Sequence, residues 1–154
     1  MRYMSLDVGD KTIGVAVSDE LLLTANGVTT IERVGIRKDS TKVLQLIKDH
    51  DVSKVIVGLP LKLDGTDSIQ TEKVREFRTL LENKLRSSGM ANVEIEFQDE
   101  RLTTVMAEKV LIEADVSRSK RKTVIDKQAA VIILQSYLEH NRVSITGGKD
   151  MNVR

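Results

Sequence analysis

The sequence has 154 residues, which is enough for one domain of ordinary size but not for two. Its hydrophobic fraction of 40% and charged fraction of 31% are typical of a globular protein and exclude a disordered or fibrous chain. With 24 Lys and Arg against 23 Asp and Glu, the net charge of +1 is not that of a dedicated nucleic-acid-binding domain, so any attraction to phosphate must be local.

The sequence contains no cysteine. This excludes disulfides, thiolate zinc sites and cysteine nucleophiles, and it favours a reducing compartment. The N-terminal residues lack the apolar segment of a secretory signal, and no run approaches the ~18 apolar residues of a membrane span. We therefore predict a cytoplasmic protein without membrane contact, in which any metal is held by oxygen or imidazole ligands.

The first third of the sequence predicts strands over residues 3–8, 12–17 and 22–31, because each run is short and rich in Val, Ile, Leu or Thr. The tight connections between them predict an antiparallel meander. A helix is predicted next, with Ser40 as its N-cap, since Val43, Leu46 and Ile47 recur at helical spacing up to His50.

The remaining chain alternates between strands and helices. Strands are predicted over 55–60 and 93–98, and helices over about 74–85, 103–114 and 123–140. This order predicts an α/β fold, with a mixed five-stranded sheet of antiparallel meander plus parallel strands and helices on both faces. We assign residues 1–141 to the domain and residues 142–154, which have no apolar periodicity, to a flexible C-terminal tail.

Asp7 stands inside the first predicted strand, where a central strand usually presents another apolar side chain. Burying an ionised carboxylate is costly unless a cation or hydrogen-bond donors compensate it. Gly9 follows, and it allows a ligand or a neighbouring backbone to come close. The pattern leaves a second interpretation open, in which Asp7 caps the turn into Asp10 and Lys11.

Asp126 falls in the first turn of the last predicted helix. Ala129, Ala130 and Ile133 follow on the same helical face, and the small alanines would let the helix lie close to the sheet and bring Asp126 to the strand ends. The alternative is a helix cap, because Thr123-x-x-Asp126 fits the capping-box pattern and an acid suits the helix dipole there.

Asp99 and Glu100 stand directly at the C-terminal end of the strand predicted over 93–98. Alternation directs them to opposite faces, with Asp99 in phase with Phe97 and Glu100 on the polar face. At most one of them faces a given site, and the pattern leaves open which one, because strand ends often kink. Arg101 is available to neutralise either.

Carboxylates from separate strand and helix ends are the ligands that Mg²⁺ or Mn²⁺ prefers. Asp7, Asp126 and one of Asp99 and Glu100 therefore predict a metal centre that activates water and polarises a scissile phosphate. His50 and His140 lack a metal-ligand partner at short spacing, and we interpret them as surface or cap residues. The basic residues predicted to hold the nucleic-acid backbone at this centre are Lys11, Arg101, Arg118, Lys120, Arg121, Lys122 and Lys127.

Four motifs, in this order, resemble the YqgF/RuvX family across about residues 3–139. They are LDVGDKTIGVAVSD (6–19), VGLP (57–60) with DGT (64–66), DERLTT (99–104), and DKQAA (126–130) with ILQSYL (133–138). The resemblance implies a ribonuclease H-like fold similar to Holliday-junction resolvases. It also implies a nuclease role in 5′-end maturation of pre-16S ribosomal RNA.

By the same resemblance, Asp7 and Asp126 look like metal-binding catalytic acids, and Glu100, with Asp99 as the alternative, looks like the third. The sequence departs from the resolvase pattern at the fourth strand, where resolvases carry an acid and this chain has Gly58-Leu59-Pro60. Pre-ribosomal RNA, branched DNA and a pre-ribosomal particle remain as partners, and both a monomer and a homodimer remain open.

Two further hypotheses belong to other classes. The Asp7–Ser18 hairpin also resembles the phosphate-binding hairpin of actin-like and sugar-kinase ATPases, but those proteins pair two such domains and 154 residues hold only one. A non-catalytic ribosome-assembly factor would use the same surface only to hold RNA.

Overall fold

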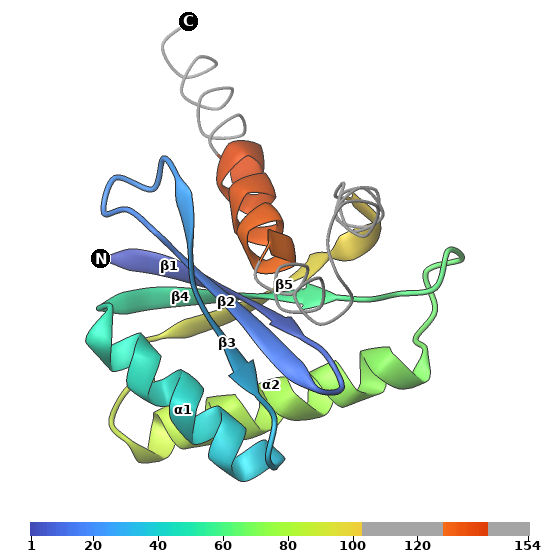
Figure 1. The fold of residues 1–154 in the computed structure, drawn as a ribbon, viewed down its shortest axis with the longest axis horizontal. Coiled ribbons are helices and arrows are strands. Elements are labelled where there is room, and N and C mark those ends of the chain that lie inside the picture. Colours follow the sequence, from blue (N-terminus) through green and yellow to red (C-terminus); the bar gives the residue numbers. More distant parts are fainter. Residues whose placement is uncertain (103–127, 142–154) are drawn as a thin grey trace, which may run out of the picture.

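The computed structural model describes residues 1–102 and 128–141, in which one mixed sheet carries helices on both faces (Figure 1). Its strands are β1 (Arg2–Val8), β2 (Thr12–Ser18), β3 (Ala25–Glu32), β4 (Val52–Leu59) and β5 (Glu94–Asp99). The order across the sheet is β3-β2-β1-β4-β5. The β1–β2 and β2–β3 pairs are antiparallel, whereas β4 is parallel to both β1 and β5. The predicted meander joined to parallel strands is therefore confirmed.

The helices form two layers. The helices α1 (Ile36–Asp49) and α2 (Ile69–Ser87) cover one face, and a helix over residues 128–141, orange in Figure 1, covers the other. A short 3₁₀ helix, η1 (Glu100–Leu102), follows β5. None of the helices in the described ranges combines the length and apolar composition that a membrane span needs. The helix predicted over 103–114 and the tail predicted over 142–154 lie outside the described residues.

Alternation along β1 sends its side chains to two different layers. Met4, Leu6 and Val8 belong to the apolar core beneath α1 and α2. Ser5 points to the other face, where its buried hydroxyl donates a hydrogen bond of 2.5 Å to the carbonyl of Ala130. Because side chains alternate along a strand, Asp7 shares the face of Ser5 and of the helix over 128–141.

The prediction that Ser40 caps α1 is wrong. The helix begins at Ile36 after Gly35, and Ser40 is buried inside it, with its hydroxyl donating to the carbonyl of Arg37. The first turn forms earlier because the buried carboxylate of Asp39 accepts the backbone N–H of Val34. This contact depends on how the preceding loop packs, which the apolar spacing does not record.

The predicted start of the third strand at Leu22 is also too early. Leu22 has a positive φ of 59°, and the Asp19 carboxylate accepts the backbone N–H groups of Leu23 and Thr24. These hydrogen bonds hold residues 19–24 in a loop, so pairing with β2 begins at Ala25.

Arg33 links the turn after Asp7 to both α1 and α2. Its Nη1 donates to the carbonyl of Gly9 at 2.8 Å, and its Nε donates to the buried Asp39 carboxylate at 3.1 Å. The guanidinium also lies 5.6 Å from the ring centre of Phe77 in α2. The Gln70 side chain of α2 adds a hydrogen bond to the carbonyl of Val8. The end of β1 is therefore held by two helices.

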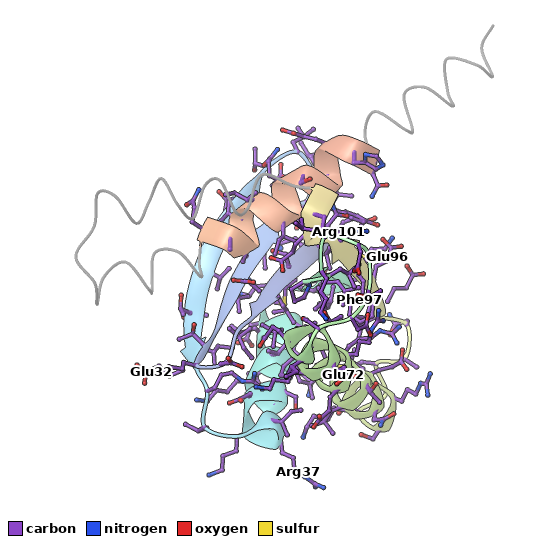
Figure 2. The ribbon with its side chains drawn as sticks, turned by 90° about the vertical axis from the view of Figure 1, so that its right-hand side faces the viewer. Glu32, Arg37, Glu72, Glu96, Phe97 and Arg101 are labelled. Carbon is purple, nitrogen blue, oxygen red and sulfur yellow. The ribbon has the colours of Figure 1, made fainter. Side chains whose placement is uncertain are left out.

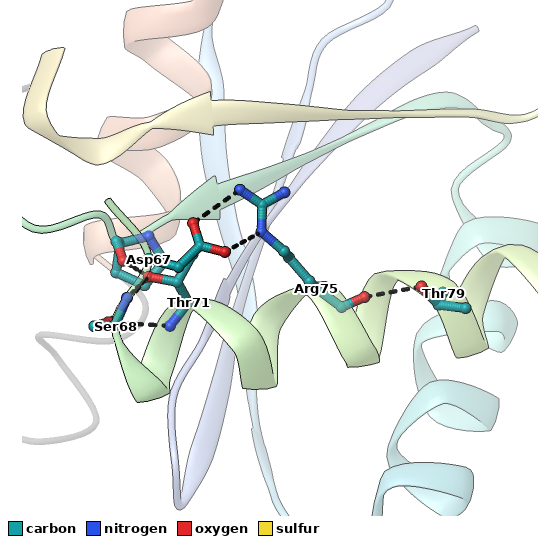
Figure 3. A network of polar contacts seen from close by, with 6 residues as sticks. Asp67, Ser68, Thr71, Arg75 and Thr79 are labelled. Carbon is teal, nitrogen blue, oxygen red and sulfur yellow. Dashed lines mark hydrogen bonds and ion pairs between the residues drawn. The ribbon is translucent and has the colours of Figure 1, made fainter. Parts of the chain in front are cut away.

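We expect Arg33→Met to lower the free energy of unfolding by about 3 kcal/mol, because it leaves Asp39 charged, buried and without its cation. The matched control is Arg75→Met. Arg75 also pairs with an aspartate, Asp67 (Figure 3), and lies over an aromatic ring, but the Arg75 and Asp67 side chains are 44% and 38% exposed. The control should cost at most about 1 kcal/mol. Urea unfolding measures both, and equal losses would contradict the assigned importance of the buried pair.

Candidate functional site

Asp7 lies one position before the end of β1 and is only 8% exposed. Its antiparallel partner in β2 is Gly14. On the other side, the parallel register pairs Leu6 with Val57, which places Asp7 alongside Gly58 of β4 at the next position. Because neighbours across strands share a face, the buried carboxylate has a glycine on each side in its row of the sheet.

Glu100 follows β5 directly, and its side chain lies over the neighbouring strand β4. A Cβ placed on Gly58 would be 3.4 Å from both Cγ and Cδ of Glu100. The same Cβ would be 2.6 Å from Cδ1 of Ile133, which belongs to the apolar cluster of the helix over 128–141. The structure therefore brings the Glu100 carboxyl group to the strand beside Asp7, on the same face of the sheet.

Asp99 is engaged elsewhere. Its carboxylate accepts the backbone N–H of Arg101 at 2.9 Å and the Arg101 guanidinium at 2.7–3.1 Å. Arg101 in turn donates to the carbonyl of Leu63 in the loop after β4. Phe97, two residues before Asp99, packs against the core on the α1 and α2 face, and Figure 2 labels both Phe97 and Arg101 near β5. The two adjacent acids thus have different surroundings.

The remaining predicted site residues divide into two groups. Lys11 is exposed in the β1–β2 turn, at the same end of the sheet as Asp7. Those outside the described residues are Arg118, Lys120, Arg121, Lys122, Asp126 and Lys127. Among the side chains in residues 1–102 and 128–141, no three His, Asp or Glu come together as a group that could hold a metal ion. Asp7 and Glu100 are the two predicted metal ligands whose positions the structure describes.

The described part of the last helix begins two positions after Asp126. Ala129 and Ala130 are buried against the sheet, and the Ala130 carbonyl is bonded to Ser5, two residues before Asp7. The close approach predicted from the paired alanines is therefore confirmed.

Sequence reasoning missed the importance of Gly14 and Gly58. The sequence pattern presents Gly58 only as part of a departure from the resolvase pattern, yet both glycines are buried within strands next to an acid. A glycine inside a strand often marks a close approach, and this signal was available in the sequence. Gly9 has a simpler explanation, because a Cβ there would be 3.1 Å from the Thr12 carbonyl oxygen across the tight turn.

A family model described as RuvX, Holliday junction resolvase, matches residues 1–140. The chain belongs to the RuvX family. A RuvX relative from Clostridioides difficile (strain 630) is 54% identical over 138 residues, covering 90% of this chain and 94% of the relative. Another from Heliobacterium modesticaldum is 49% identical over 139 residues, covering 90% and 89%. Both relatives carry the name "Putative pre-16S rRNA nuclease".

Solved structures confirm the ribonuclease H-like fold expected for a RuvX protein. RuvC of T. thermophilus in complex with a Holliday junction substrate superposes with a TM-score of 0.60, covering 92% of this chain and 96% of that chain. The Fowlpox virus resolvase in complex with Holliday junction DNA gives a TM-score of 0.54, covering 91% and 98%. Both are 12% identical in sequence, so they establish the fold alone.

The Asp99–Arg101 pair should make the stability of the folded protein depend on pH in the acidic range. Hydrogen bonds from the Arg101 side chain hold the pKa of the Asp99 carboxyl below its ordinary value. Because the folded-state pKa is the lower one, the ionised carboxylate stabilises the fold above the unfolded-state pKa of about 4. This contribution is lost as the pH falls through the folded-state pKa.

We therefore expect the wild type to lose more thermal stability than Asp99→Asn when the pH is lowered from about 5 to about 2. Thermal unfolding followed by circular dichroism across this range measures the difference. Parallel stability profiles of the two proteins would contradict the assigned pairing.

Proposed function

We propose that this RuvX protein is a divalent-metal-dependent nuclease that hydrolyses phosphodiester bonds, with Asp7, Glu100 and Asp126 as catalytic acids and metal ligands. One observation carries the proposal. A carboxylate that is only 8% exposed lies on a central strand, and a second carboxyl group reaches over the adjacent strand from the end of β5. Two acids brought together in this way gain from a shared cation, which offsets the cost of burying Asp7 and of placing two like charges near each other.

The donor set fits a hard cation such as Mg²⁺ or Mn²⁺, because its atoms are carboxylate oxygens and the sequence has no cysteine. When bound, such an ion polarises the scissile phosphate and lowers the pKa of the attacking water. Asp7 and Glu100 would hold it from two directions, one from the sheet surface and one from η1. The rigid end of β1, fixed by Arg33 and Gln70, would keep the Asp7 oxygens in place.

The substrate we propose is the 5′ leader of pre-16S ribosomal RNA. Two relatives that carry the name "Putative pre-16S rRNA nuclease" are 54% and 49% identical over nearly their whole lengths. With such a substrate the protein would act in the cytoplasm and would contact pre-ribosomal particles. Branched DNA is the second candidate, because the matching family model is described as a Holliday junction resolvase.

The basic residues around the centre would hold the phosphate backbone. They are Lys11, Arg101, Arg118, Lys120, Arg121, Lys122 and Lys127. Of the two in the described ranges, Lys11 is exposed, whereas the Arg101 guanidinium is already bonded to Asp99 and to the Leu63 carbonyl. We therefore assign Lys11 the more direct phosphate contact and Arg101 the additional task of holding the loop after β4.

We expect Asp7→Asn and Asp126→Asn each to reduce Mn²⁺-dependent cleavage of a pre-16S 5′-leader RNA by at least about a hundredfold, because each removes a charged metal ligand. RNA affinity should remain largely intact. The control is Asp10→Asn, an exposed acid three residues from Asp7 that pairs with Lys73. Equal cleavage by the wild type and both site variants would end the nuclease proposal. Binding without cleavage by the wild type would favour the assembly-factor hypothesis.

The third ligand is tested by a pair of variants at adjacent positions. We expect Glu100→Gln to weaken Mn²⁺ binding by at least about tenfold, because its carboxyl group lies on the face of Asp7. Asp99→Asn should retain an affinity within about twofold, because Asp99 is bonded to Arg101 instead. Isothermal titration calorimetry with Mn²⁺ measures both. The reverse order of losses would transfer the role to Asp99.

A further inference from the structure

Gly58 is a buried glycine in β4, between the core residues Val57 and Leu59. Its backbone does not require glycine, because it pairs as ordinary strand with Gln98 of β5 and is not among the described glycines that have positive φ. Glycine weakens a strand interior, since it packs no side chain and loses more conformational freedom on folding. The reason for glycine at this position must therefore lie in what occupies the space above it.

Two side chains enter that space from different elements. The Cδ1 atom of Ile133 comes from the helix over 128–141 and would be 2.6 Å from a Cβ on Gly58. The Cγ and Cδ atoms of Glu100 come from η1 and would be 3.4 Å away. A single methyl group would therefore collide with Ile133 but only touch Glu100. We expect the additional atoms of a branched side chain to compete with Glu100 for this space.

We propose that Gly58 is a positioning residue: its missing side chain leaves room for the Glu100 carboxylate to lie across β4 beside Asp7. This inference rests on the proposed metal-dependent function. The chain supplies the second carboxylate from the end of β5 rather than from β4 itself, and β4 is bare at that point so that the side chain can cross it. An acid placed on β4 at residue 58 would occupy the space that the Glu100 side chain now fills, on the same face of the sheet as Asp7.

A purely structural explanation is that Gly58 only accommodates Ile133 and so lets the helix dock on the sheet. The two explanations separate in an Ile133→Val background, because valine lacks the Cδ1 atom that a Cβ would strike. In that background, a substitution at residue 58 acts chiefly on Glu100. The parent for every comparison below is therefore the full chain carrying Ile133→Val.

The experiment measures Mn²⁺ affinity by calorimetry and stability by urea unfolding. Adding Gly58→Ala to the parent should leave the affinity within about twofold, because 3.4 Å is an ordinary contact. Adding Gly58→Val should lower the affinity by about tenfold or more while the protein stays folded. Adding Gly58→Asp together with Glu100→Ala, which removes the atoms that fill this space, should restore most of the affinity that Glu100→Ala alone removes. This last variant tests the proposal even if the valine variant fails to fold.

The outcomes distinguish the role of Gly58 from the assignment of Glu100 as a metal ligand. Suppose that Glu100→Gln weakens Mn²⁺ binding, but that Gly58→Val does not lower the affinity and an acid moved to residue 58 does not restore it. The role of Gly58 is then overturned, and the metal site stands. If the parent binds no Mn²⁺, or Glu100→Gln has no effect, the assignment of Glu100 in the proposed function fails and the Gly58 inference fails with it.

Discussion

The constraint on which this structure depends is the burial of an ionisable carboxylate on the central strand of a sheet. Asp7 is only 8% exposed and stands between core residues Leu6 and Val8. Removing such a group from water is costly unless charge or hydrogen bonds compensate it. The neighbouring row positions on β2 and β4 are both glycines, so no side chain flanks Asp7 in its own row of the sheet.

The scaffold around Asp7 is rigid because several distant segments hold the strand that carries it. Ser5 bonds to the helix over 128–141, while Arg33 and Gln70 hold the backbone carbonyls of Gly9 and Val8. Each contact spans a large separation in sequence, so the position of Asp7 depends on the whole domain. Such support would suit the proposed metal site, because the groups that orient a ligand affect metal affinity strongly.

The adjacent acids Asp99 and Glu100 show how one step along the chain puts two carboxylates in different surroundings. Asp99 is neutralised by Arg101, which also holds the loop after β4. Glu100 turns to the opposite face and reaches over Gly58. The alternation of side chains, rather than the chemistry of the two acids, decides which of them lies on the face of Asp7.

The sequence by itself determined the mixed sheet, its helices on both faces, and the candidate acids, because strand and helix periodicities and the position of Asp7 inside an apolar run are local patterns. It did not determine the start of α1, where Asp39 rather than Ser40 organises the first turn. It also left open which of Asp99 and Glu100 faces the site. Only the tertiary structure showed which of the two acids lies on the face of Asp7, because the space above Gly58 is formed by β4, η1 and a helix about 75 residues away, which meet only in the folded chain.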